Sequence, residues 1–248
     1  MQFLDCNLSY GPEALGAQVK SCTNIAALKA HLIRAGIAGG LVSKACSEVG
    51  YSNASLAEDL RDETGLWGVW RLLPSSAGEI PPPQSMPNAM KAQGIAALTI
   101  CPESNRFMPS KLAMGDYYEM ACERKIPLLL NTSRGLTLEQ AAELLRDFPA
   151  MTCILTYANC WPSDRRLRPF LDTYENLYLD MSYILTDSWL KDFRMKYPAS
   201  RLLFGSAFPE SYLGAHMMVI RHAEIAEEDK RLIAGENLMR LLREARYD

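Results

Sequence analysis

Short apolar runs alternate along the chain with longer segments in which apolar side chains recur at helical spacing. The apolar runs predict strands over residues 3–7, 36–43, 66–73, 95–101, 126–131, 152–157, 177–181 and 201–204. The intervening segments predict helices over residues 24–34, 54–63, 86–93, 110–124, 138–147, 164–172, 188–196 and 213–224. Thr23 is the expected cap of the first helix, and Gly36 ends it. The pattern therefore consists of one strand followed by one helix, repeated from end to end.

This strict alternation predicts an α/β fold of the (β/α)8 type, a TIM barrel that occupies residues 1–248 as a single domain. An open doubly wound sheet would need a glycine-rich phosphate loop after its first strand, and residues 7–11 do not contain one. Residues 229–246 predict a last amphipathic helix that covers the barrel with Leu232, Leu238, Leu241 and Leu242. Residues 75–87 include three consecutive prolines and predict a loop, which could also serve as a ligand for a partner domain.

Composition excludes several classes of protein. Lys and Arg number 26 against 29 Asp and Glu, the net charge is −3, and hydrophobic residues make up 48% of the chain. These values are typical of a globular protein and argue against a disordered chain or a nucleic-acid-binding protein. Charged residues interrupt every apolar run, so we expect no membrane span. The first residues lack the pattern of a secretory signal, and the seven cysteines have no paired spacing, so we expect reduced thiols and a cytoplasmic location.

Polar residues stand where the predicted strands end, which in a parallel barrel is the face that carries function. In the first strand, simple alternation places Asp5, Asn7 and Ser9 toward the interior and Cys6 toward the helices. The later strands end with further polar residues, namely Asn131, Tyr157, Asn159, Asp180 and Ser206.

Six segments of the chain resemble sequence motifs of one family of barrels, in the same order. They are residues 4–9 (I-D-x-H-x-H in the family), 126–131 (I-P-V-x-x-H), 154–157 (I-L-A-H), 176–182 (N-V-Y-L-D-x-S), 201–209 (R-[IL]-L-F-G-S-D-F-P) and 235–242 (G-x-N-A-x-R-L-L). In these motifs the chain resembles the amidohydrolase-related family, the metal-dependent hydrolases and decarboxylases of the amidohydrolase superfamily. The resemblance implies the same TIM-barrel fold and, in an ordinary member, a divalent metal that activates water.

The departures from these motifs fall on the metal ligands that the resemblance implies. Those positions hold Asn7, Ser9, Asn131, Tyr157 and Ala207 in place of four histidines and an aspartate. Neutral amides and hydroxyls are poor ligands for such a cation, and alanine supplies neither a ligand nor a base. The sequence therefore predicts no metal site and no cofactor. The chain's three histidines all lie outside the matched positions.

Other chemistry at the barrel mouth is still open. Asp5 and Asp180 are candidates for a catalytic acid–base pair, because neighbouring carboxylates raise one pKa; both could instead simply accept structural hydrogen bonds. The predicted substrate-binding residues are Asn7, Ser9, Asn131, Arg134, Tyr157, Asn159 and Ser206. Arg134, with Arg106, could receive a carboxylate or a phosphate, or could remain a solvated loop residue. The thiols of Cys101 and Cys160 lack a visible activating base.

Three functions remain as hypotheses. The first is a pseudoenzyme or small-molecule-binding barrel that has lost its metal site. The second is a hydrolase or decarboxylase that uses an unusual metal site or acid–base groups alone. The third is a protein-interaction scaffold. The expected partner is a small molecule, with no nucleic acid and no membrane, and a homo-oligomer is compatible with the sequence.

Overall fold

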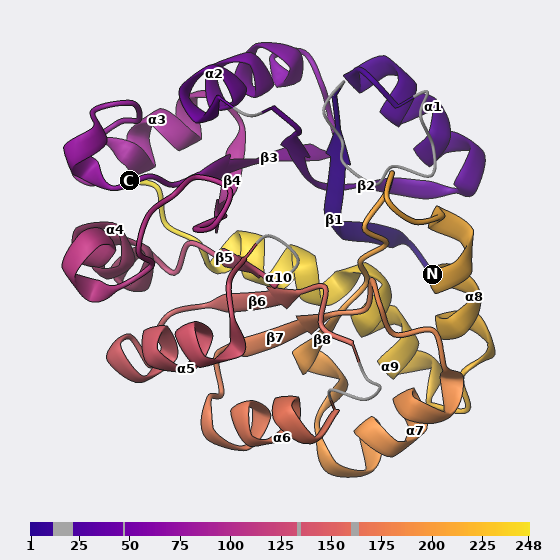
Figure 1. The fold of residues 1–248 in the computed structure, drawn as a ribbon. Helices are drawn as coiled ribbons and strands as arrows, with labels where there is room; N and C mark the ends of the chain where they lie inside the picture. The colour runs from indigo at the N-terminus through magenta and orange to yellow at the C-terminus, as the bar shows by residue number, and fades with distance from the viewer. Residues whose placement is uncertain (12–21, 47, 133–134, 160–163) are drawn as a thin grey trace.

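A computed structural model shows eight parallel strands in the order β1 to β8, with helices outside them (Figure 1). The structure describes residues 1–11, 22–46, 48–132, 135–159 and 164–248. The strands are β1 (Phe3–Tyr10), β2 (Ile37–Lys44), β3 (Leu66–Arg71), β4 (Ile95–Ile100), β5 (Leu128–Asn131), β6 (Cys153–Thr156), β7 (Leu177–Asp180) and β8 (Leu202–Leu203). Hydrogen bonds from the amides of Cys6 and Ser9 to the carbonyls of Phe204 and Phe208 join β1 to the β8 segment. The predicted (β/α)8 fold is confirmed.

The surrounding helices match the predicted positions within two residues, except α2, which begins five residues and ends three residues before the predicted bounds of 54 and 63. They are α1 (Ile25–Ala35), α2 (Val49–Leu60), α3 (Met86–Ala92), α4 (Lys111–Arg124), α5 (Leu138–Asp147), α6 (Asp164–Thr173), α7 (Asp187–Lys196) and α8 (Leu213–His222). Single 3-10 turns occur at Ser75–Ala77 and Ala199–Arg201. Gly36 ends α1 in the left-handed conformation as expected, but the cap is Asn24 and not Thr23, because the Asn24 side chain accepts from the amide of Ala27.

Two hydrophobic layers hold the barrel together. The larger one lies between the strands and the helices. The smaller one fills the interior with side chains from alternate strand positions, including Leu41, Val69, Leu129 and Leu203. Among the described residues no helix is both long and apolar enough to cross a lipid bilayer.

The interior cluster corrects one prediction about β1. Cys6 belongs to this cluster and lines the same cavity as its neighbour Asn7, so it does not face the helices. Leu4 belongs to the same cluster, so β1 alternates here with the phase opposite to the predicted one. Beyond Asp5 the pairing is irregular, because Asp5 pairs with Gly40 and Leu8 with Val42, so that three steps on β1 match two on β2. This β-bulge lets Asn7 line the cavity beside Cys6.

The C-terminal segment covers the barrel, as predicted, at the end opposite the mouth, but it is not one regular helix, and Leu232 packs against the outer core. It runs as α9 (Glu227–Arg231), a π-helical turn over Leu232–Glu236, and α10 (Asn237–Glu244), and α10 crosses the end of the strand ring (Figure 1). The wider turn leaves the carbonyl of Ile233 to accept from the amide of Phe204 after β8, at 2.8 Å. Leu238 and Leu241 complete the interior cluster.

Helix α5 begins with a complete capping box. The Thr137 hydroxyl accepts from the amide of Gln140 at 3.2 Å, and the Gln140 side chain accepts from the amide of Thr137 at 3.0 Å. We expect Thr137→Ala to lower the free energy of unfolding by about 1 kcal/mol, measured by urea denaturation. Thr137→Ser keeps the hydroxyl and is the matched control; an equal loss in both variants would contradict this role of the cap.

Candidate functional site

A small cavity lies inside the C-terminal end of the barrel. Its volume is about 30 Å³, which holds one or two water molecules. Its lining comes from six strands and the residues that directly follow them: Cys6, Asn7, Leu8, Leu41, Ser43, Val69, Arg71, Thr99, Cys101, Leu129, Asn131 and Thr156. Arg71 is the one cation in this set, and no residue of the set is a carboxylate or a histidine. The described lining is thus a mixture of apolar and neutral polar side chains with one guanidinium.

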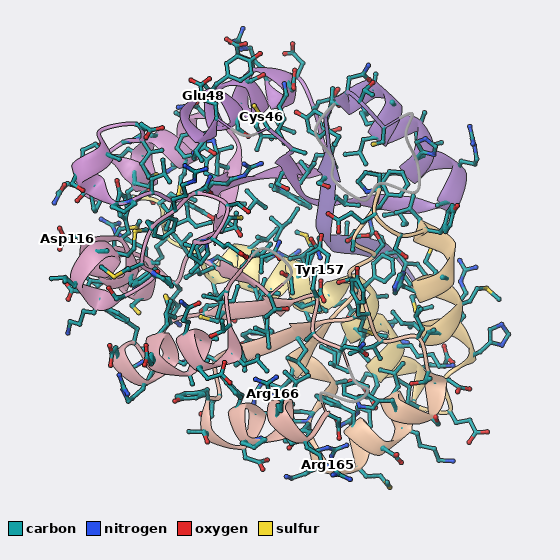
Figure 2. All side chains as sticks on the ribbon, viewed as in Figure 1. Cys46, Glu48, Asp116, Tyr157, Arg165 and Arg166 are labelled. Carbon is teal, nitrogen blue, oxygen red and sulfur yellow. The ribbon has the colours of Figure 1, made fainter. Side chains whose placement is uncertain are left out.

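Arg71 is the last residue of β3 and is held in place from both ends. Its backbone amide and carbonyl bind the side chain of Asn53 on α2, at 3.0 and 2.9 Å. Its guanidinium donates to the carbonyl of Lys44 at 2.6 Å and to that of Cys46; Cys46 lies beside the start of α2 (Figure 2). Arg71 is 8% exposed. The fold therefore presents a fixed, nearly buried guanidinium to the cavity.

Asn7 connects this cavity to the two predicted catalytic carboxyls. Its backbone amide donates to Oδ1 of Asp5 at 2.9 Å, and its side-chain Nδ2 donates to Oδ2 of Asp180 at 2.8 Å. Ser182 donates to Asp180 from its backbone amide and its hydroxyl, and the amide of Ser206 donates to Asp5 at 3.2 Å. The two carboxyls thus meet around Asn7, but neither lines the cavity.

Burial dominates the ionisation of both carboxyls. It raises the pKa of Asp5 from 3.8 to about 7, against the opposing effect of hydrogen bonds from Ser206 and Asn7. It raises the pKa of Asp180 from 3.8 to about 6, against hydrogen bonds from Ser182 and Asn7. Oδ2 of Asp5 has no hydrogen-bond partner among the described residues. Near neutral pH these groups can therefore exchange a proton with their surroundings.

The structure separates the remaining predicted residues into three places. Asn131 lines the cavity with Asn7. Tyr157 and Asn159 line a neighbouring pocket of about 410 Å³ between the starts of α5 and α6, and Tyr157 lies near the centre of the ring of strands (Figure 2). Ser9 is half-buried against the carbonyl of Phe208, and Ser206 is fully buried and accepts from the amide of Phe208.

Three further candidates from the sequence do not line the cavity within the described residues. Arg134 and Cys160 lie outside the described residues. Arg106 is exposed in the loop after β4 and does not line the cavity. Arg71 and Ser43 were not predicted as site residues, because the third strand was expected to continue to residue 73 and no polar residue was assigned to the end of the second or the third strand. A single arginine after the apolar run Leu-Trp-Gly-Val-Trp was the available signal.

The residues at the matched metal positions do not fit a divalent cation. The side-chain Nδ2 of Asn7 donates to Oδ2 of Asp180, so the carboxylate oxygen that a metal would bind there is already hydrogen-bonded. Ala207 has no donor atom in its side chain. In the described ranges, no group of three or more His, Cys, Asp or Glu side chains is arranged to hold a metal ion.

Strained backbone also gathers at this end of the barrel. Tyr157, directly after β6, and Ala207, which follows β8, have φ angles of +61° and +54°. This left-handed conformation is unfavourable for residues other than glycine, and such residues cluster at functional sites. The buried His216 donates from Nε2 to the carbonyl of Ser182 at 2.6 Å, so it supports the Asp180 region without entering the cavity.

Comparison with known proteins shows a shared fold. No family model matches the sequence, and no curated protein matches it. An uncharacterised TIM-barrel protein from Bordetella bronchiseptica is similar in structure, with a TM-score of 0.77, 19% identity, and 98% and 99% of the two chains covered.

Two similar structures are named decarboxylases. One is 5-carboxyvanillate decarboxylase from Sphingomonas paucimobilis, with a TM-score of 0.74, 12% identity and 98% and 99% coverage. The other is dihydroxybenzoic acid decarboxylase from Polaromonas, with bound manganese and an inhibitor, with a TM-score of 0.74, 15% identity and 98% and 97% coverage. At these identities the likeness establishes the fold alone.

Proposed function

We propose that this chain is a divergent amidohydrolase-related barrel that binds a small carboxylate at Arg71 and does so without a divalent metal. The observation that carries the proposal is the cavity itself, which is lined by one fixed guanidinium and several neutral polar side chains. An arginine fork suits a carboxylate. A carboxylate group is about the size of the waters that the cavity holds.

The named activities of similar barrels support a carboxylate ligand. Carboxyvanillate and dihydroxybenzoic acid are both carboxylic acids, and the enzymes named for them share this fold. The conserved fold and the motif resemblance support a common ancestry. The residues at the matched metal positions support the loss of the metal, because they do not supply its donors.

Substitution of Arg71 tests the carboxylate site. In calorimetric titrations of the purified full chain with butyrate, we expect Arg71→Gln to weaken binding about 10- to 100-fold, since it removes a charge-assisted hydrogen bond. Arg71→Lys keeps the charge without the planar fork, so we expect its affinity for butyrate to lie between those of the wild type and Arg71→Gln. It also keeps the test usable if Arg71→Gln does not fold. Arg165→Gln, at a solvent-exposed position on α6, is the control (Figure 2).

Two outcomes would overturn the proposal. Equal butyrate affinity in the wild type and both Arg71 variants would move the site elsewhere. A stoichiometric, tightly bound manganese, zinc or iron in the purified protein, found by elemental analysis, would contradict the metal-free part.

A second candidate is metal-independent acid–base catalysis by Asp5 and Asp180. It is favoured by their meeting around Asn7, which itself lines the cavity. In this case Asp180→Asn would abolish turnover of a bound carboxylate while leaving its affinity within about threefold. Turnover that survives this substitution would exclude Asp180 as the acid.

A further inference from the structure

A separate pocket lies at the end of the barrel opposite the mouth, beside the start of β1. It has a volume of about 340 Å³, which falls within the roughly 300–1,000 Å³ of small-molecule sites. Its lining comes from the start of β1, the end of α9, the π-helical turn and α10, and consists of Gln2, Leu4, Arg231, Gly235, Glu236, Met239 and Arg243. The pocket is therefore large enough for a small organic ligand.

Two arginines bring uncommitted hydrogen-bond donors to this pocket. Neither the guanidinium of Arg231 nor that of Arg243 donates a hydrogen bond to any described residue. Nε of Arg231 lies 3.7 Å from Oε1 of Glu236, which is too far for a hydrogen bond. Each guanidinium carries five N–H donors in a planar fork. These donors are available to a ligand in the pocket.

The charges around the pocket favour an anion. The described lining contains the two guanidiniums and one carboxylate, that of Glu236. Glu227 also interacts with Arg231, but its Oε1 is bound by Lys230 at 2.8 Å. A phosphate offers several acceptor oxygens and up to two negative charges, so it matches a pair of guanidiniums better than a singly charged group does.

Buried contacts hold the walls of the pocket in place. Asn237, directly after the π-helical turn, is 1% exposed and donates from Nδ2 to the carbonyls of Ala199 and Leu202 at 2.9 and 2.8 Å. A Cβ atom on Gly235 would lie 3.0 Å from the carbonyl oxygen of Gln2, so the turn packs closely on the start of β1. The pocket is thus formed before a ligand binds, which lowers the cost of binding, and π-helical turns are frequent at functional sites.

The floor of the pocket is apolar. Leu4 is buried in the interior cluster, and the half-buried Met239 packs against that cluster. Covering apolar surface of this kind is favourable by about 25 cal/mol per Å². A ligand that joins an apolar body to its anionic group would therefore bind more tightly than the anionic group alone.

We propose that this pocket binds a small phosphate monoester, whose phosphate lies between Arg231 and Arg243 and whose apolar body lies against Leu4 and Met239. The described linings of this pocket and of the cavity at the mouth share no residue, so the proposal is independent of the carboxylate site at Arg71. The ligand would contact both the start of β1 and α10, and its binding would stabilise the folded chain.

Phenyl phosphate and phenyl sulfate are matched probes, because they have nearly the same shape and differ in charge. In calorimetric titrations of the purified full chain at pH 7.5, where the phosphate is mostly a dianion, we expect phenyl phosphate to bind about 10-fold more tightly than phenyl sulfate. It should bind about 5-fold more tightly than inorganic phosphate, because its ring covers the apolar floor.

Substitutions in the lining locate the site. Arg231→Gln and Arg243→Gln should each weaken phenyl phosphate binding about 10-fold, since each removes a charge-assisted hydrogen bond. Glu236→Gln removes the carboxylate from the lining and should strengthen binding about threefold. A gain in affinity does not arise from a folding defect, so this variant keeps the test decisive if an arginine variant is unstable. Arg165→Gln, at an exposed position on α6, is the control and should leave the affinity unchanged.

Three results would overturn the proposal. Equal phenyl phosphate affinity in the wild type and all three lining variants would move the site away from this pocket. Equal binding of phenyl phosphate and phenyl sulfate would contradict the preference for a phosphate. Equal binding of phenyl phosphate and inorganic phosphate would show a site for the ion only, with no role for the apolar floor.

Discussion

Gly40→Ala is expected to remove about 4 kcal/mol or more from the free energy of unfolding. A Cβ atom at this position on β2 would lie 1.9 Å from the backbone oxygen of Asp5 and 2.8 Å from its nitrogen. Real Cβ atoms do not approach a backbone so closely, so β1 and β2 would have to separate. The φ angle of Gly40, +156°, adds strain for any other residue. A loss of this size is a large fraction of the stability of a typical domain.

Gly214→Ala is the matched control for this effect. Gly214 lies in α8, and an added Cβ would meet no heavy atom within 4 Å. Since alanine is the better helix former, this variant should be as stable as the wild type or up to about 1 kcal/mol more stable. Urea denaturation followed by circular dichroism measures both variants. A Gly40→Ala midpoint close to that of the wild type would show that the β1–β2 contact can relax.

Most of the fold could be predicted because each strand and helix has its own local pattern. The segments 138–147 and 188–196, for example, correspond closely to α5 and α7. The shortest strand was the hardest case: residues 201–204 predict a strand, but β8 contains only Leu202–Leu203. Arg201 ends a 3-10 turn instead, and its guanidinium binds the carbonyls of Leu177 and Tyr174. Such a tertiary contact leaves no local signal.

The site could be predicted only in part for a similar reason. Asn7 and Asn131 were found because they stand at the ends of apolar runs, and both line the cavity. The β-bulge that lets Asn7 line the cavity beside Cys6 depends on how β1 pairs with β2, and a single strand does not encode that register. Arg71 enters the cavity because α2 and the loop before it hold both ends of the residue. Its role therefore depends on contacts 18 to 27 residues away in the chain.

The buried carboxyls give the molecule an unusual dependence of stability on pH. In the folded chain the pKa of Asp5 is about 7 and that of Asp180 about 6, whereas the ordinary value is 3.8. At a pH between the ordinary pKa and the raised one, the two carboxyls are ionised in the unfolded chain but protonated in the folded chain. The folded state then binds more protons, so stability is fully present below about pH 4 and falls as the pH rises through 6 and 7. The two groups together should lower the free energy of unfolding by about 4 kcal/mol from pH 5 to pH 8.

Asp5→Asn isolates the larger part of this effect. The asparagine oxygen can still accept from the amides of Asn7 and Ser206, and its nitrogen replaces Oδ2, which has no partner among the described residues. We expect the variant to be nearly as stable as the wild type at pH 5 and more stable at pH 8, because it never carries the buried charge. Asp62→Asn alters an exposed carboxyl and should follow the wild type at both pH values. If the free energies of unfolding of Asp5→Asn and the wild type differ by the same amount at pH 5 and pH 8, Asp5 does not titrate between these pH values in the folded chain. Burial would then not be what sets the pKa of Asp5.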